Sequence, residues 1–178
     1  MDVREFKWLS RGMKIIFEVI GIIVMIQGVL FLVSLFVGEG LPSIFLSVRD
    51  YSLQNVIGSL TPVYTNDFVG FITSSVEKFL LAYTFYHVSQ FFLYLEKDVT
   101  PFSVKVYQKL RKIGCLLILA DIGIPLIYSL ILPFTTMKPV MIDLVMVSSL
   151  TFVGVIILFM AEVIRYGVKL QEFSDDAV

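Results

Sequence analysis

The sequence has few of the residues on which most enzyme sites and disulfide scaffolds depend. Its 178 residues include one cysteine, one histidine and one tryptophan, and 16% are charged, against roughly a quarter in soluble chains. The single cysteine, Cys115, excludes an intramolecular disulfide and is expected to be a small, buried apolar residue. The formal net charge of −1 gives no overall basic field, so no direct contact with nucleic acid is expected.

Motifs of enzymatic chemistry are also absent. The sequence has no His-Glu-x-x-His, no Gly-x-Ser-x-Gly and no phosphate-binding glycine loop. A metal site needs three or four ligands, and one intramembrane histidine does not supply them, because the carboxylates other than Asp121 lie at the predicted membrane edges. We therefore expect no enzyme activity, no catalytic residue, no metal and no cofactor.

Long apolar runs, in contrast, are abundant. Hydrophobic residues make up 57% of the chain, and the charged residues gather in blocks between apolar stretches. A run of about 20 apolar residues crosses a bilayer as a helix. The sequence therefore predicts an all-α integral membrane protein, a single domain forming a four-transmembrane-helix bundle. Its predicted spans are residues 15–37, 68–95, 113–132 and 140–164.

The distribution of Lys and Arg predicts the orientation of this bundle. Eleven of the fourteen lie in the N-terminal arm, in a basic turn at 96–112 or in the tail, whereas two lie in the other two connections. The positive-inside rule then places both termini and the basic turn in the cytoplasm, N-in and C-in. Residues 38–67 become a larger extracytoplasmic loop, either strand-like or an interfacial helix.

Polar residues inside the predicted spans suggest a site. His87 and Gln90 lie in the second span, Asp121 in the third and Gln27 in the first. His87 and Asp121 are each eight residues, about 12 Å, from the cytoplasmic edge of their span, so they are expected at one depth. Pro125 leaves the carbonyl of Asp121 without its helical partner and predicts a kink. Either this centre handles protons or cations with His87 as the switch, or Asp121 and His87 form a structural pair.

Smaller patterns predict local contacts. Gly21 and Gly28 are seven residues apart and would let another helix approach the first span closely. Lys14 and Glu18 have the i,i+4 spacing of a helical ion pair. Lys78 is expected to extend toward the headgroups at the outer end of the second span.

The basic turn carries a further signal. Either Thr100 or Ser103 is placed to cap a short amphipathic helix that leads into the third span. The charge of the turn is explained by contact with anionic lipids at the cytoplasmic face, and a docking site for a cytoplasmic protein is the alternative.

Two segments resemble a known family. The basic turn contains a Pro-Phe-Ser segment followed by a Leu-Arg-x-Ile-Gly segment, and the chain closes on Ala-Glu-Val-Ile-Arg-x-Gly. These segments, Thr100–Ser103 with Val106–Gly114 and Phe159–Glu172, are similar to motifs of a bacterial four-helix membrane family, number 2975 among the domains of unknown function. The resemblance implies a bacterial inner-membrane protein. It also implies, through the gene neighbours of many members, a cytoplasmic helix-turn-helix regulator as a partner.

Together these observations predict a non-enzymatic accessory, immunity or stress-signalling membrane protein. Its partners would be anionic lipids and either such a regulator or another membrane protein. The alternative is a small transporter or channel, a homo-oligomer built around the intramembrane polar centre. A cytoplasmic ion clasp is also expected, in which Glu162, with Arg165 on the same face of its helix, pairs with Arg111 or Lys112.

Overall fold

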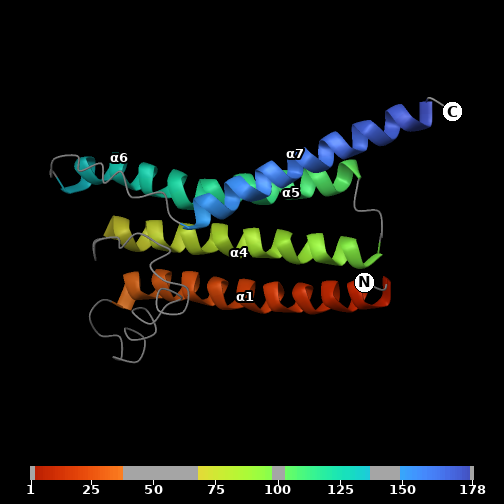
Figure 1. Cartoon of the computed structure of the whole chain (residues 1–178). Helices are drawn as coiled ribbons and strands as arrows, with labels where there is room; N and C mark the ends of the chain where they lie inside the picture. Colours follow the sequence, from red (N-terminus) through yellow and green to blue (C-terminus); the bar gives the residue numbers. More distant parts are fainter. Residues whose placement is uncertain (1–2, 38–67, 98–102, 137–148, 177–178) are drawn as a thin grey trace.

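The computed structural model describes residues 3–37, 68–97, 103–136 and 149–176, and all of these except Ser103 are helical. They form four rods (Figure 1), and no strand occurs among them, so the all-α prediction is confirmed for this part of the chain. The interpretation of 38–67 as strand or interfacial helix falls outside the described residues. The four rods are α1 (Val3–Val37), α4 (Phe68–Lys97), the continuous α5 (Val104–Ile118), η2 (Leu119–Gly123) and α6 (Ile124–Thr136), and α7 (Ser149–Asp176).

Three described helical stretches are long and apolar enough to cross a membrane, namely Arg4–Val33, Val104–Ile131 and Leu150–Phe173. α4, the predicted second span, is not among them. It lies between α1 on one side and α5 and α6 on the other, so polar residues on its flanks face protein. The outward faces of the bundle, in contrast, are apolar. Cys115 is exposed on α5, which contradicts its expected burial.

α1 packs along the length of α4. A methyl group added to Gly21 would lie 3.4 Å from Phe85 Cβ, and one added to Gly28 would lie 3.2 Å from Phe79 Cε1. The prediction that these two glycines admit a neighbouring helix is therefore confirmed. Closer to the start of α1, the ring of Phe17 stacks on those of Phe85 and Phe92, with centroids 6.1 and 5.6 Å away.

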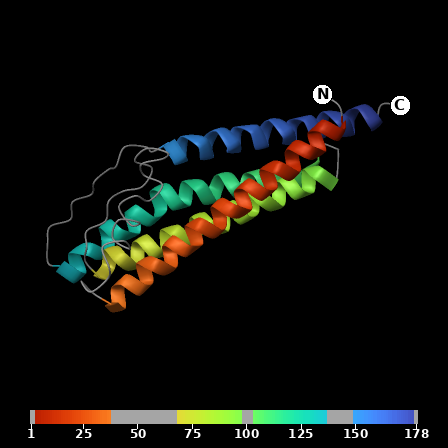
Figure 2. The same cartoon turned by 90° about the horizontal axis from the view of Figure 1, so that it is seen from below.

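One end of the bundle gathers most of the basic residues, and we call it the basic end. α1 and α5 begin there, and α4 and α7 end there (Figure 2). Ser103 caps α5, because its hydroxyl accepts a hydrogen bond from the Val106 N–H at 3.3 Å. Of the two predicted caps, Thr100 and Ser103, the structure thus shows Ser103. The predicted Lys14–Glu18 ion pair is present at 3.9 Å, and Arg11 Nε donates to Glu96 at 2.9 Å, joining α1 to α4.

A π-helical turn, η2, interrupts the third rod where Pro125 follows it. Pro125 has no N–H, so the carbonyl of Asp121 loses its ordinary α-helical donor. The Ile124 N–H donates instead to the carbonyl of Leu119, five residues earlier, which is the π-helical pattern. The irregularity predicted at this proline is thus a widened turn.

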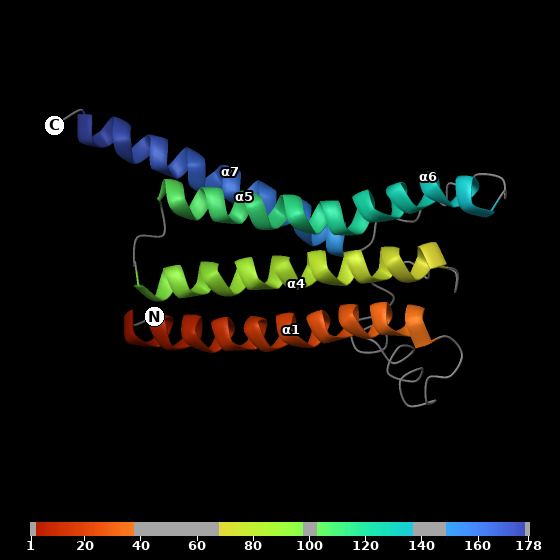
Figure 3. The same cartoon turned by 180° about the vertical axis from the view of Figure 1, so that it is seen from behind.

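α7 differs from the predicted fourth span. It begins at Ser149 and continues to Asp176, twelve residues beyond the predicted end, while the predicted part at 140–148 lies outside the described residues. Figure 3 shows that α7 starts beside the junction of α5 and α6 and runs back along α5 to the basic end. Hydropathy reports where apolar character stops, whereas the helix continues through Arg165, Lys169 and Glu172, which are good helix formers.

Two glycines allow α5 and α7 to cross closely. A methyl group on Gly114 would lie 2.8 Å from Leu158 Cγ and 2.9 Å from the carbonyl oxygen of Gly154. One on Gly154 would lie 2.9 Å from Ile118 Cγ1. Close approach at small residues is the usual way in which helices associate within membranes.

Gly114→Ala should therefore destabilise the protein by about 1–2 kcal/mol in detergent, measured by thermal unfolding. Overpacking costs about 1–3 kcal/mol, and the better helix propensity of alanine offsets up to about 1 kcal/mol of it. The control is Gly12→Ala, because Gly12 has no neighbour within 4 Å of the added carbon. That variant should be as stable as the wild type or more so, and equal midpoints for the two variants would contradict the close crossing.

Candidate functional site

Asp121 lies at the start of α7, although it belongs to η2. Its Oδ2 accepts a hydrogen bond from the Thr151 N–H at 2.9 Å and another from the Thr151 hydroxyl. The first N–H groups of a helix have no acceptor within that helix, and a negative charge is favourable beside them. The carboxylate therefore caps α7 from a neighbouring rod.

His87 lies in different surroundings, facing the basic part of α5. Its ring meets Tyr83 edge-on at 4.5 Å between centroids, and Tyr86 lies 5.7 Å away. Lys112 Nζ donates to the Tyr83 hydroxyl at 3.1 Å. His87 Nε2 is buried and has no hydrogen-bond partner among the described residues.

The structure thus does not bring His87 and Asp121 together. Ala120, the neighbour of Asp121, packs on Leu81, which is six residues or about 9 Å along α4 from His87. The prediction aligned the ends of the second and third spans, but α5 begins at Val104, well before the predicted span start. The first turns of α5 lie beside the last turns of α4. Asp121 is therefore farther from the basic end than His87 is.

The two predicted glutamines lie at separate places in the bundle. Gln27 is half-buried on α1 beside Gly28, and its Oε1 is buried without a hydrogen-bond partner in the part of the chain that is described. Gln90 is half-buried near the end of α4. The four predicted residues therefore form no single polar centre.

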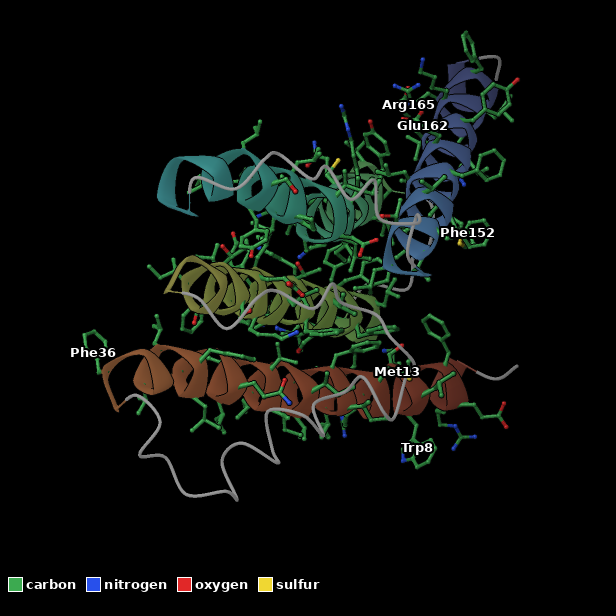
Figure 4. All side chains as sticks on the ribbon, turned by 90° about the vertical axis from the view of Figure 1, so that its left-hand side faces the viewer. Trp8, Met13, Phe36, Phe152, Glu162 and Arg165 are labelled. Carbon is green, nitrogen blue, oxygen red and sulfur yellow. The ribbon has the colours of Figure 1, made fainter. Side chains whose placement is uncertain are left out.

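The predicted clasp of α5 and α7 is built differently. Glu162 pairs with Arg165 at 2.7 Å on its own helix, and the two side chains lie next to each other on α7 in Figure 4. Arg165 lies over the ring of Tyr107, 5.7 Å from its centroid, and Arg111 donates to the Tyr107 hydroxyl at 3.1 Å. An aromatic ring between the two cations thus takes the place of the expected Glu162 pair with Arg111 or Lys112.

A buried ion pair on α4 was not anticipated. Glu77 and Lys78 are 3% and 9% exposed, and Lys78 Nζ lies 3.4 Å from Glu77 Oε1. Lys78 faces α1, with its Cβ 3.3 Å from a methyl group added to Gly28, so the expected extension toward the headgroups is wrong. Lys78 lies ten residues inside the predicted span 68–95 and not at its end, and this position was the available signal. No group of three or more side chains suited to a metal occurs among the described residues.

Comparison with known families shows a match over α4 to α7. The family described as "Protein of unknown function (DUF2975)" matches residues 68–176, which is more than half of the chain. The chain belongs to this family. No curated protein and no solved structure matches the chain.

The DUF2975 match covers α4 to α7 and both segments on which the resemblance rested. Asp121, Thr151, Tyr107, Glu77 and Lys78 all lie inside it. α1, which covers Lys78 and carries Gln27, lies outside the matched residues. The cap of α7, the Tyr107 contact and the buried ion pair are therefore features of the DUF2975 region itself.

Proposed function

We propose that this protein is a non-enzymatic accessory, immunity or stress-signalling protein of the bacterial inner membrane, with its basic end in the cytoplasm. It would act by binding a cytoplasmic protein through the end of α7. One observation supports this most directly. α7 extends past the other helices at the basic end (Figure 1), and Tyr166, Leu170 and Phe173 on that extension are 66%, 54% and 74% exposed.

The spacing of these three residues indicates the kind of partner. Positions i, i+4 and i+7 lie on one face of a helix and are the anchors with which an amphipathic helix fills an apolar groove. The extension beyond Arg165 has eleven residues, whereas a coiled coil with a second copy needs roughly three to four heptads. We therefore infer a cytoplasmic protein with an apolar groove as the occupant.

A photo-crosslinking residue at Lys169 in living cells would identify the partner. Binding of the purified partner to the purified full chain would then be measured. Leu170→Ser with Phe173→Ser should weaken it at least tenfold. Phe152→Ser is the matched control, because Phe152 is equally exposed (Figure 4) on the same face of α7 but far from its end, and it should change binding less than twofold.

Three outcomes would contradict the proposal. Crosslinks only to a second copy of the chain would make α7 a self-association surface. Crosslinks only to lipid would make it an interfacial anchor. Equal losses of binding in the paired variant and the control would remove the end of α7 from the interface.

A small oligomeric transporter or channel is the second candidate, and the buried Glu77–Lys78 pair favours it. Ionisable residues inside a membrane bundle often mark transport pathways. Proton or cation flux into liposomes separates the two candidates. Flux that disappears in a folded Glu77→Gln variant would support transport, and absence of flux in the wild type would leave the accessory role.

A further inference from the structure

Two lysines between α4 and α5 have tyrosines as partners in place of carboxylates. Lys109 Nζ lies 5.7 Å from the ring centroid of Tyr94, and Lys112 Nζ lies 5.3 Å from that of Tyr83, whose hydroxyl it also meets at 3.1 Å. Neither lysine forms an ion pair with a described residue. Other cations toward this end do, as the pairs Arg11–Glu96, Lys14–Glu18 and Arg165–Glu162 show.

His87 completes this cluster. Its ring meets the Tyr83 ring edge-on with centroids 4.5 Å apart, and its buried Nε2 has no hydrogen-bond partner among the described residues. The Tyr83 hydroxyl accepts from Lys112 and keeps its own proton for another acceptor. Lys112, the Tyr83 phenol and the His87 imidazole thus lie together, and Lys109 is one helical turn from Lys112 on α5. No ion pair with a described residue neutralises either lysine, and such a composition suits an anion.

The cluster lies where the apolar part of the bundle begins. Gly21 lies against Phe85 and Tyr86, so Glu18, three residues closer to the basic end, is level with His87. From Val19 to Val37 the first helix carries no charged residue. Tyrosines concentrate at the same boundary in membrane proteins, at the level of the lipid headgroups. Tyr83 and Tyr86 are about half exposed there.

Apolar side chains continue from the cluster toward the far end of the bundle. Val76 lies seven residues from Tyr83 on α4, and Leu119 lies seven residues from Lys112, so each follows the face of its helix. Both are about half exposed. The acyl chain of a phospholipid can lie along this apolar surface while the phosphate of its headgroup stays at the lysines. A free phosphate ion would contact the lysines but not the apolar surface.

We propose that Lys109, Lys112, Tyr83 and His87 form a binding site for the phosphate group of an anionic membrane phospholipid, between α4 and α5. Lysines bind phosphate as point charges, and basic pockets between membrane helices recognise anionic headgroups. The site is distinct from the end of α7, so its existence does not depend on the proposed protein partner.

Binding of phosphatidylglycerol to the purified full chain in detergent, followed by native mass spectrometry, tests the site. Lys109→Gln with Lys112→Gln should weaken binding at least tenfold. Lys97→Gln with Lys105→Gln is the matched control, because it removes the same charge from exposed positions on the same two helices, and it should change binding less than twofold. Tyr83→Phe, which deletes one hydroxyl, should weaken binding severalfold while the fold is kept.

Further arms distinguish the source of the phosphate. Phosphatidylcholine should bind at least tenfold more weakly than phosphatidylglycerol, and inorganic phosphate at 10-fold excess over the lipid should displace little of it. Full displacement by inorganic phosphate would assign the site to a soluble anion and overturn the lipid proposal. Equal losses of lipid binding in the Lys109/Lys112 variant and in the Lys97/Lys105 control would show only general attraction between opposite charges, and would overturn the proposed site.

Discussion

Replacement of Lys78 by methionine should lower the free energy of unfolding by about 3–5 kcal/mol, the usual cost of breaking a buried ion pair. The variant removes the ammonium group that lies 3.4 Å from Glu77, a residue that is 3% exposed within the bundle. For a chain of this size such a loss lowers the unfolding midpoint by on the order of 10 °C. Thermal unfolding of the detergent-solubilised protein measures it.

The double variant Glu77→Gln with Lys78→Met is the control. Replacing both members of a buried pair by uncharged residues of similar volume is often neutral, so this protein should unfold near the wild-type midpoint. Lys105→Met, at an exposed position on α5, should also leave the midpoint unchanged. If Lys78→Met alone had no effect, Lys78 would reach water and the interior position of the pair would be wrong.

Features set by local sequence were predictable. The apolar runs predict helical rods, Gly21 and Gly28 predict a close neighbour for α1, and Ser103 was one of two candidates for the cap of α5. Each depends on residues a few positions apart. Pro125 likewise predicts an irregular turn, since the missing N–H acts within one helical turn.

Features set by the offset between helices were not predictable. Asp121 meets Thr151, thirty residues away, because the crossing of Gly114 and Gly154 fixes how far α7 is shifted along α5. No pattern within either segment records that shift. The alignment of His87 with Asp121 failed for the same reason, since it assumed that neighbouring spans end at one level.

The polarity of α4 shows a second limit of hydropathy. A helix that lies between others can bury serines, threonines and an ion pair, so its composition no longer resembles that of a lipid-facing span. The sequence predicts a span at 68–95 and places Glu77 and Lys78 near its outer end, whereas α4 is not among the helices apolar enough to cross a membrane. Only the structure shows that both are buried and that Lys78 packs against Gly28 of α1.

Removal of the carboxylate of Asp121 should loosen the start of α7. Asp121→Ala should destabilise the protein by about 2–3 kcal/mol, because the Thr151 N–H and hydroxyl both lose a charged acceptor in a buried position. Asp121→Asn keeps an oxygen that can accept both hydrogen bonds but removes the charge beside the helix start, so about 1 kcal/mol should be lost. Thermal unfolding in detergent gives both values.

Thr151→Val separates the two donors, because it deletes the hydroxyl and leaves the N–H in place. Combined with Asp121→Ala, it should cost less than the sum of the two single changes, since both remove the same hydrogen bond. A role in ion or proton movement predicts the opposite pattern. There Asp121→Asn would abolish flux in liposomes while the unfolding midpoint stayed at the wild-type value. If Asp121→Ala lowers the unfolding midpoint more than Asp121→Asn does, and neither changes flux, the carboxylate is the structural link between the third rod and α7.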